Sequence, residues 1–256
     1  MQKIDGRFIA AGIIEELKKK PAPGKILAAI LVGNDLASSS FIKIKEKVAG
    51  DLSIRFDLYQ LPDLVSQEEL EDKIKKVSND PKIGGIIVQL PLPKKFDRER
   101  ALSYINHEKD VDGLVSDLVE SPVVGVIKEI LKSQNKSLND LSVAVVGKGR
   151  LVGQPIIKWL KKDGVKFKVA DSQTENLQEV LSGADLIITG VGKKDLINPE
   201  WLKKGAGIID FGFPPDLQIL KIENCKLKIG FYTPTPGGTG PILVAELFKN
   251  FYILNS

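Results

Sequence analysis

The feature that most constrains the fold of this 256-residue chain is a regular alternation of short apolar runs with longer amphipathic segments. Residues 26–32 form an unbroken apolar run, which is typical of a parallel strand buried on both faces. Residues 6–20 instead carry apolar side chains at three- and four-residue spacing behind Asp5, which predicts a capped amphipathic helix. Repeated strand–helix–strand units indicate parallel sheets with helices on both faces, so we predict an α/β fold.

The same patterns predict two series of such units along the chain. We expect further strands at residues 54–58, 85–90, 141–146, 165–170, 186–189, 207–211 and 227–230. We expect further helices at residues 37–49, 66–78, 97–105, 122–133, 177–181 and 241–251, and one that ends at residue 162. Turn-rich segments at 113–122 and 234–240 are the expected joints between two domains.

Composition excludes several classes of function. The single Cys and single His exclude an intrachain disulfide, a Cys-based zinc site and a His-pair metal site, so we predict no metal. The net charge of +4 comes from Lys interleaved with Glu, which indicates a solvated surface rather than a nucleic-acid footprint. No apolar run is long enough for a membrane span, and the N-terminus lacks a signal-peptide pattern. We therefore expect a cytoplasmic enzyme or binding protein.

A glycine-rich segment follows the predicted strand at residues 141–146. Gly147, Gly149 and Gly153 have the spacing G-x-G-x-x-x-G, one residue longer than the commonest dinucleotide fingerprint. Glycine permits a tight turn and a close approach to a pyrophosphate, and the following helix N-terminus offers unpaired N–H groups to the anion. The segment predicts a dinucleotide site, and a strand-to-helix turn without a ligand is the alternative.

The choice of cofactor depends on charged residues near this turn. Asp171 ends the next predicted strand, where a carboxylate accepts hydrogen bonds from an adenosine ribose and repels a 2′-phosphate, which favours NAD. Lys148 and Arg150 argue for NADP, because both can pair with a phosphate. A simple turn cap formed with Ser172 is the alternative role of Asp171.

Lys45 interrupts the apolar side of the predicted helix at residues 37–49. It lies four positions after Phe41 and three before Val48, so it is on or beside the apolar stripe. A lysine that is partly buried there would have its pKa lowered by desolvation, which suits proton transfer. The alternative is that its stem covers the stripe while the ammonium stays in water.

Other polar residues are expected near the same ligand-binding edge. Gln89 falls at the carboxyl end of a predicted strand, where open α/β sheets bind ligands. Asp110 and Asp112 precede a turn, and they are either ligand-binding carboxylates or turn caps. Residues 234–241 form a rigid Gly- and Pro-rich entry to the last helix, which is either a ligand-binding loop or a plain connection.

Together these segments resemble the methylenetetrahydrofolate dehydrogenase/methenyltetrahydrofolate cyclohydrolase family over nearly the whole chain. The matching segments are residues 32–38, the F-x-x-x-K of 41–45, and residues 88–93, 109–113, 146–155, 184–192 and 233–241. Several such blocks in the family's order are far more specific than any single block.

The resemblance implies a two-domain homodimer that acts on small molecules. Residues 1–118 would form an α/β folate domain that is completed by the C-terminal helix at 241–256, and residues 119–240 a Rossmann-like NAD(P)-binding domain across a cleft. The implied reactions are hydride transfer from 5,10-methylenetetrahydrofolate to NAD(P)+ and, in most members, hydrolysis of the methenyl product to 10-formyltetrahydrofolate. Both belong to one-carbon metabolism.

The resemblance also assigns roles to residues of this chain. Lys45 matches the catalytic lysine, Gln89 the glutamine that contacts both lysine and substrate, and Asp112 the acid that binds the pterin. The implied substrate contacts are Phe41, Pro91, Pro236 and Gly240. The implied cofactor contacts are Gly147, Lys148, Gly149, Arg150, Gly153, Asp171, Ser172 and Gly192.

Some residues depart from the family's pattern. Phe41 stands where the family normally has Tyr, so the hydroxyl beside Lys45 is missing, and a dehydrogenase without cyclohydrolase activity is one alternative. Asp171 occupies a position that usually holds His in the family. Residues 120–125 differ from the family's P-C-T-P-x-G segment, and the stretch just before Thr233 is shorter than in the family. A second hypothesis is a folate- or nucleotide-binding protein that lost catalysis, and a third is a different two-domain dehydrogenase, such as one acting on shikimate.

Overall fold

The computed structural model describes residues 1–218 and 229–256, and its contacts divide the chain into two compact units. Unit 1 comprises Met1–Ala10 and Val123–Leu243, and unit 2 comprises Ala11–Pro122 and Val244–Ser256. The helices α1 (Gly6–Lys18) and α9 (Thr239–Leu254) each have several residues in both units. None of the helices in the described part of the chain is both long and apolar enough to cross a membrane.

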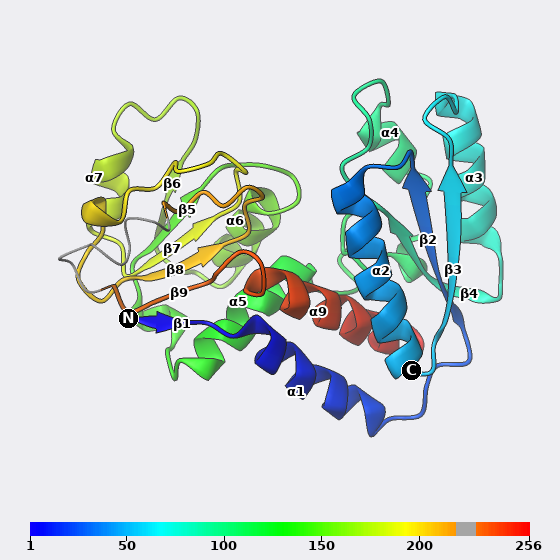
Figure 1. The fold of residues 1–256 in the computed structure, drawn as a ribbon, viewed down its shortest axis with the longest axis horizontal. Coiled ribbons are helices and arrows are strands. Elements are labelled where there is room, and N and C mark those ends of the chain that lie inside the picture. The colour runs from blue at the N-terminus through cyan, green and yellow to red at the C-terminus, as the bar shows by residue number, and fades with distance from the viewer. Residues whose placement is uncertain (219–228) are drawn as a thin grey trace. The chain divides into compact units, whose positions relative to one another are not determined.

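Unit 2 is built on a three-stranded parallel sheet with the order β3-β2-β4 (Figure 1). The strands are β2 (Ile26–Val32), β3 (Arg55–Leu61) and β4 (Ile83–Val88), and the helices are α2 (Leu36–Asp51), α3 (Gln67–Asn79) and α4 (Arg98–Leu102). One face of the sheet packs on α2, α9 and part of α1, and the other on α3 and α4. The central strand β2 is buried almost throughout because both of its faces are covered.

Unit 1 is built on a six-stranded parallel sheet with the order β1-β9-β8-β7-β5-β6. Its strands are β1 (Gln2–Lys3), β5 (Val143–Val146), β6 (Phe167–Ala170), β7 (Leu186–Thr189), β8 (Gly207–Asp210) and β9 (Phe231–Tyr232). Its helices include α5 (Pro122–Ser133), α6 (Gly153–Lys162) and α7 (Leu177–Ser182). Strands and helices alternate as in a Rossmann-like unit, so the predicted α/β class with parallel sheets is confirmed.

The division of the chain differs from the expected one at the N-terminus. Residues 1–10 belong to unit 1 rather than to the folate domain expected at 1–118, because β1 pairs with β9 and the Gly6 N–H donates to the Gly237 carbonyl at 2.9 Å. The other two boundaries lie after Pro122 and after Leu243, a few residues beyond those expected after residues 118 and 240. A two-residue strand is too short to produce a hydrophobic pattern, so the sequence does not predict β1.

The last helix joins unit 2 as the resemblance implied. Phe248 and Phe251 of α9 are fully buried in the core beneath α2. The Asn250 side chain donates to the carbonyls of Val111 and Glu120 at 2.9 and 2.8 Å. The unit-2 part of the helix, from Val244 onwards, is therefore held by its apolar face and by an amide that binds two backbone carbonyls of unit 2.

Most predicted elements are present with shifted ends. The strand expected at 54–58 runs over Arg55–Leu61, and the helix expected at 97–105 ends at Leu102 behind its Asp97 cap. The strand expected at 227–230 is not found at residues 229–230, and residues 227–228 lie outside the described residues. The strand in this region is β9, at Phe231–Tyr232. Hydrophobic pattern locates elements more reliably than it locates their ends.

Candidate active site

Lys45 is buried in unit 2, with only 4% of its surface exposed. It lies on α2, which begins behind the Asp35 cap, where the carboxylate accepts the Ser38 N–H at 2.8 Å. Its Nζ atom donates to Oε1 of Gln89 at 3.0 Å and lies 5.0 Å from the centre of the Phe41 ring. The expected burial of Lys45 is therefore confirmed, and the alternative with a solvated ammonium is wrong.

Gln89 is held in place by the carboxyl end of β4. Its backbone N–H continues the sheet by donating to the Ile30 carbonyl at 2.9 Å. Its side-chain nitrogen donates to the Leu90 carbonyl at 2.7 Å, which turns the amide oxygen toward Lys45. This edge of the sheet is where open α/β sheets bind ligands.

The two carboxylates that precede Gly113 have different surroundings. Asp110 is 1% exposed and accepts the N–H groups of Leu114, Val115 and Ser116 at 3.1, 2.7 and 2.9 Å. Asp110 is thus the turn cap that sequence analysis left open as one of its two roles. Asp112 is only partly exposed, and it is close enough to Lys45 for each charge to affect the other's pKa.

Burial sets the protonation behaviour of Lys45 and Asp112. Desolvation lowers the pKa of Lys45, and the nearby negative charge of Asp112 opposes part of that shift. The pKa of Asp112 is raised to about 6, mainly by burial; the charge of Lys45 opposes this rise and the charge of Asp110 adds to it. A lysine and a carboxylate whose pKa values both move toward neutrality are suited to proton exchange near pH 7.

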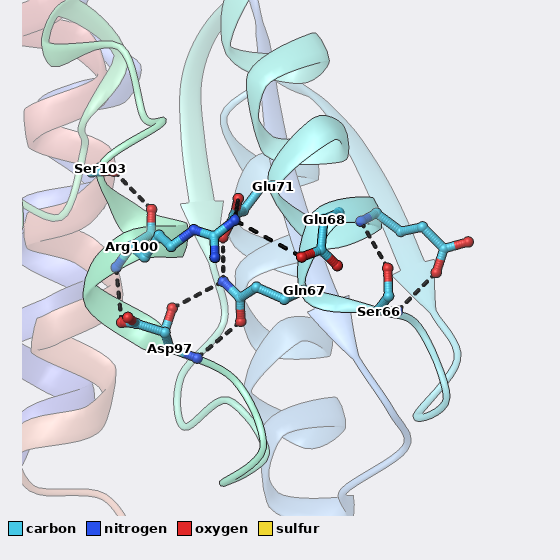
Figure 2. Close-up of polar contacts among 8 residues, drawn as sticks. Ser66, Gln67, Glu68, Glu71, Asp97, Arg100 and Ser103 are labelled. Atoms are coloured by element: carbon cyan, nitrogen blue, oxygen red, sulfur yellow. Dashed lines mark hydrogen bonds and ion pairs between the residues drawn. The ribbon is translucent and has the colours of Figure 1, made fainter.

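The loop that follows Gln89 is fixed at its far end by a polar network (Figure 2). Gln67, at the start of α3, accepts the Asp97 N–H at 2.9 Å and donates to the Asp97 carbonyl at 3.2 Å. Glu71 is buried, accepts from Gln67 and pairs with Arg100 at 2.8 Å. Pro91 is exposed in the same loop, between Gln89 and the network at Asp97.

The glycine turn of unit 1 has the geometry that a dinucleotide requires. Gly147 has φ +94°, and a Cβ on Gly153 would lie 2.1 Å from the Gly147 carbonyl oxygen. These two positions need glycine because of the turn and of the close packing of α6. A Cβ on Gly149 would meet nothing within 4 Å, which leaves room for a ligand. No side chain caps the N-terminus of α6, so its N–H groups remain suited to an anion.

Two of the residues expected to determine cofactor preference, Lys148 and Asp171, form an ion pair in unit 1. Lys148 Nζ lies 2.6 Å from Oδ2 of Asp171, at the end of β6. The hydrogen bond from Lys148 lowers the pKa of Asp171, with a smaller contribution from the Gln173 N–H at 2.9 Å. Asp171 therefore caps its own turn as well as facing Lys148. Ser172 is exposed beside it and Arg150 is partly buried in the glycine turn.

Three further residues expected from the resemblance also lie in unit 1. Gly192 follows β7 with φ +73°, Pro236 is exposed in the loop before α9, and Gly240 lies in the first turn of α9. The structure thus gathers Phe41, Lys45, Gln89 and Asp112 in unit 2 and the glycine turn with Asp171 in unit 1.

Sequence analysis missed two buried carboxylates at the carboxyl edge of the unit 1 sheet. Asp210 ends β8 with 1% exposure, and Asp216 follows it with none. An acid directly after the buried run 207–209 was an available signal for Asp210. Asp216 follows two prolines in an irregular segment, where no periodic pattern marks it.

These features define a class of protein. A Rossmann-like sheet with a glycine turn, and a separate α/β sheet with a buried lysine, are the parts of an enzyme that combines a nicotinamide dinucleotide with a second substrate. The family models agree. Residues 4–112 match the tetrahydrofolate dehydrogenase/cyclohydrolase catalytic domain, and residues 122–255 match the NAD(P)-binding domain of the same family. The chain belongs to the tetrahydrofolate dehydrogenase/cyclohydrolase family.

Curated relatives and solved structures support this assignment. Proteins named bifunctional protein FolD from Caldicellulosiruptor saccharolyticus and Staphylococcus aureus are each 34% identical to this chain. The alignments cover 93% and 96% of the chain and 91% and 94% of those relatives. The FolD structure from Campylobacter jejuni is 30% identical with a TM-score of 0.88, and the alignment covers 98% of this chain and 97% of that one.

More distant structures separate this family from others with the same fold. The Trypanosoma brucei enzyme, solved with NADP and an inhibitor, is 27% identical with a TM-score of 0.90, over 98% of this chain and 96% of that one. A shikimate 5-dehydrogenase from Thermus thermophilus is only 15% identical with a TM-score of 0.61, over 89% and 93%. That likeness is one of fold alone, so the shikimate alternative is not favoured.

Proposed function

We propose that this chain oxidises 5,10-methylenetetrahydrofolate to the methenyl form with a nicotinamide dinucleotide, and hydrolyses the product to 10-formyltetrahydrofolate. The observation that carries the proposal is the buried Lys45 in contact with Gln89 and under the influence of Asp112. The relatives at 34% identity are named as bifunctional proteins, which favours both steps over the dehydrogenase-only and binding-protein alternatives.

In the oxidation, unit 2 binds and orients the folate. Asp112 is suited to accept two charge-assisted hydrogen bonds from the amino-pyrimidine edge of the pterin. The dinucleotide, which the glycine turn of unit 1 would hold, would supply the acceptor for the hydride of the methylene carbon. The resulting cation is delocalised over N5 and N10, so the oxidation needs no metal and no acid on the protein. A lysine with a lowered pKa places less positive charge beside that cation than an ordinary lysine would.

In the hydrolysis, Lys45 handles the protons. Its neutral amine accepts a proton from water as the water oxygen bonds to the methenyl carbon. The bond from this carbon to N5 then breaks, N5 takes up a proton and the hydroxyl proton is lost, so one proton is released overall. The Gln89 amide oxygen accepts one N–H of the lysine and thereby directs the amine.

Phe41 replaces the family's Tyr without removing the ring from the site. The ring centre lies 5.0 Å from Nζ, at a distance typical of a cation–π contact. Lys45 is thus oriented by Gln89 and by the aromatic face, and these contacts support hydrolysis without the Tyr hydroxyl.

We further propose NAD as the preferred cofactor. Asp171 places a carboxylate at the end of β6, and its lowered pKa keeps it ionised at neutral pH. That charge suits a ribose hydroxyl and repels a 2′-phosphate. The paired Lys148 weakens the repulsion, so the preference is for NAD without full exclusion of NADP.

The test is a spectral assay in two parts. The protein is mixed with 5,10-methylenetetrahydrofolate and either NAD+ or NADP+, and reduced cofactor is followed by absorbance. Methenyltetrahydrofolate is then supplied alone and its decay is compared with that in buffer. Reduced cofactor and catalysed decay are expected. If methenyltetrahydrofolate decays no faster than in buffer, the protein is a dehydrogenase without cyclohydrolase activity. If neither part gives a signal, the protein is a binding protein without catalysis.

Three expectations stay predictions. They are that the chain forms a homodimer, that it is cytoplasmic, and that one domain binds the folate while the other binds NAD(P). Sedimentation of the purified chain would test the first of them, since a dimer has twice the mass of the 28.0 kDa chain.

A further inference from the structure

The carboxylate of Asp216 binds the loop that leaves β7, and none of the steps above uses it. Its Oδ2 atom accepts the Thr189 hydroxyl at 2.5 Å and the Val191 N–H at 2.7 Å. Its Oδ1 atom accepts the Lys193 N–H at 2.7 Å. The side chain has no exposed surface, so these three donors compete with no water. One carboxylate therefore fixes residues 189–193 at the start, middle and end.

This loop packs directly against the glycine turn. A Cβ on Gly147 would lie 2.9 Å from Cγ2 of Val191, and a Cβ on Gly190 would lie 2.7 Å from Cγ1 of Val152. On its other side, a Cβ on Gly192 would lie 3.2 Å from the Phe213 carbonyl oxygen. The loop is thus enclosed by the turn at 147–152 and by the segment that carries Asp216, so its position depends on both.

The segment that carries Asp216 is itself fixed by Asp210. Asp210 Oδ1 accepts the Gly212 N–H at 2.7 Å, and its Oδ2 accepts the Leu217 N–H at 2.9 Å. The pKa of Asp210 is raised to about 6, mainly by burial and to a smaller extent by the charge of Asp216. A continuous path of hydrogen bonds therefore runs from the end of β8, through residues 212–217, to the loop after β7.

We propose that Asp216 is a positioning residue for the dinucleotide, which holds the loop at 189–193 in the shape that the bound cofactor contacts. The inference rests on the proposed function, because it requires a dinucleotide at the carboxyl edge of unit 1. The three donors lie at the end of β7 and in the loop that follows it, and this loop adjoins the turn with the open Gly149 position. The carboxylate therefore acts at the ligand edge of the unit 1 sheet.

The principal variant is Asp216→Asn. It keeps the volume, but its amide nitrogen cannot accept a hydrogen bond and must face one of the three donors. We expect the Kd for NAD+, measured by calorimetry without folate, to rise about tenfold or more, and the KM for NAD+ to rise with it. Hydrolysis of methenyltetrahydrofolate, which uses no nucleotide, should be retained. The amides of residues 189–193 should also exchange hydrogen faster.

Asp185→Asn is the matched control. Asp185 lies just before the amino end of β7 and accepts from Ser142 Oγ at 2.6 Å and from Lys203 Nζ at 2.5 Å. Its loss should lower the Tm while leaving the Kd for NAD+ unchanged. If Asp216→Asn does not fold, Thr189→Val removes one donor and keeps the carboxylate, and a smaller rise in Kd is expected.

The outcomes separate this inference from the proposed function. An unchanged Kd in Asp216→Asn, or in Thr189→Val where that variant is needed, would overturn the positioning role. An equal rise in Asp185→Asn would overturn it as well, because the effect would then be general destabilisation. A wild-type protein that binds neither NAD+ nor NADP+ would instead overturn the proposed function.

Discussion

The Nζ atom of Lys45 lies 3.0 Å from Oε1 of Gln89, a residue 44 positions further along the chain. An amide oxygen accepts a hydrogen bond from a lysine in either protonation state and adds no net charge. Burial therefore remains the dominant influence on Lys45 and lowers its pKa, whereas a carboxylate in place of Gln89 would raise it. Gln89 orients the lysine without stabilising its charged form.

Lys45→Met should abolish the hydrolysis of methenyltetrahydrofolate while the fold is kept. Methionine retains an apolar stem of similar length but has no amine, so the loss should be at least about 100-fold, within the usual contribution of a general acid–base group. The measurement is the decay of methenyl absorbance. Lys43→Met is the control, because Lys43 is exposed on the same helix. Wild-type hydrolysis in Lys45→Met would remove this lysine from the mechanism.

Gln89→Glu should raise the pKa of Lys45 and shift the hydrolysis profile toward higher pH. The new carboxylate would favour the ammonium, so less neutral amine would be present at pH 7 and the rate there would fall. The rate should recover as the pH rises through the new pKa. Gln60→Glu, at an exposed glutamine whose amide donates to the Gly33 carbonyl, should leave the profile unchanged. A parallel loss at every pH would show that Gln89 acts by contacting the substrate instead.

The sequence predicts much of this site because periodic patterns record local structure. Three- and four-residue spacing placed Lys45 on or beside the apolar stripe of its helix, and a short apolar run placed Gln89 at the end of a strand. The meeting of Lys45 and Gln89 depends on the packing of α2 against the sheet, which local periodicity does not encode. The resemblance to a family, rather than any pattern, supplied that pairing.

Other features left no local signal. The strand β1 is two residues long and forms only because β9 is beside it, so the assignment of residues 1–10 needs the tertiary structure. Asp216 lies in an irregular segment, and its importance comes from three donors more than twenty positions earlier in the chain. Such contacts depend on the course of the backbone, which neither propensity nor periodicity specifies.

Asp112 should determine how kcat/KM for the folate falls at low pH. Its pKa of about 6 means that the carboxylate is lost below that pH, so kcat/KM for the folate should fall about tenfold per pH unit there. Asp112→Asn should give a low kcat/KM that no longer depends on pH in this range. The folded-state pKa lies above that of an unfolded Asp, so ionisation between about pH 4 and 6 lowers the free energy of unfolding. The free energy of unfolding of Asp112→Asn should therefore fall less between about pH 4 and 6 than that of the wild type. If kcat/KM of the variant still falls below about pH 6 as in the wild type, Asp112 is not the group that titrates.

Phe41 provides a direct test of the missing hydroxyl. Phe41→Tyr keeps the ring 5.0 Å from Nζ and adds a second polar partner for Lys45, so hydrolysis should be retained or faster. Phe41→Leu removes the ring that packs beside Nζ and leaves the amine less well oriented, so hydrolysis should slow severalfold. The same decay assay measures both. Equal rates in the Leu variant and the wild type would show that the ring does not act on Lys45.

Asp171 and Lys148 should act on cofactor choice as a pair. In Asp171→Ser the repulsive carboxylate is gone and Lys148 is released, so the ratio of kcat/KM for NADP+ to that for NAD+ should rise about tenfold. Adding Lys148→Ala should remove most of that gain, because the freed ammonium is then absent. The two substitutions are in contact, so their effects should not add. Lys161→Ala, at an exposed lysine on α6, is the control for a general change in charge. An unchanged cofactor ratio in Asp171→Ser would show that this carboxylate does not face the ribose.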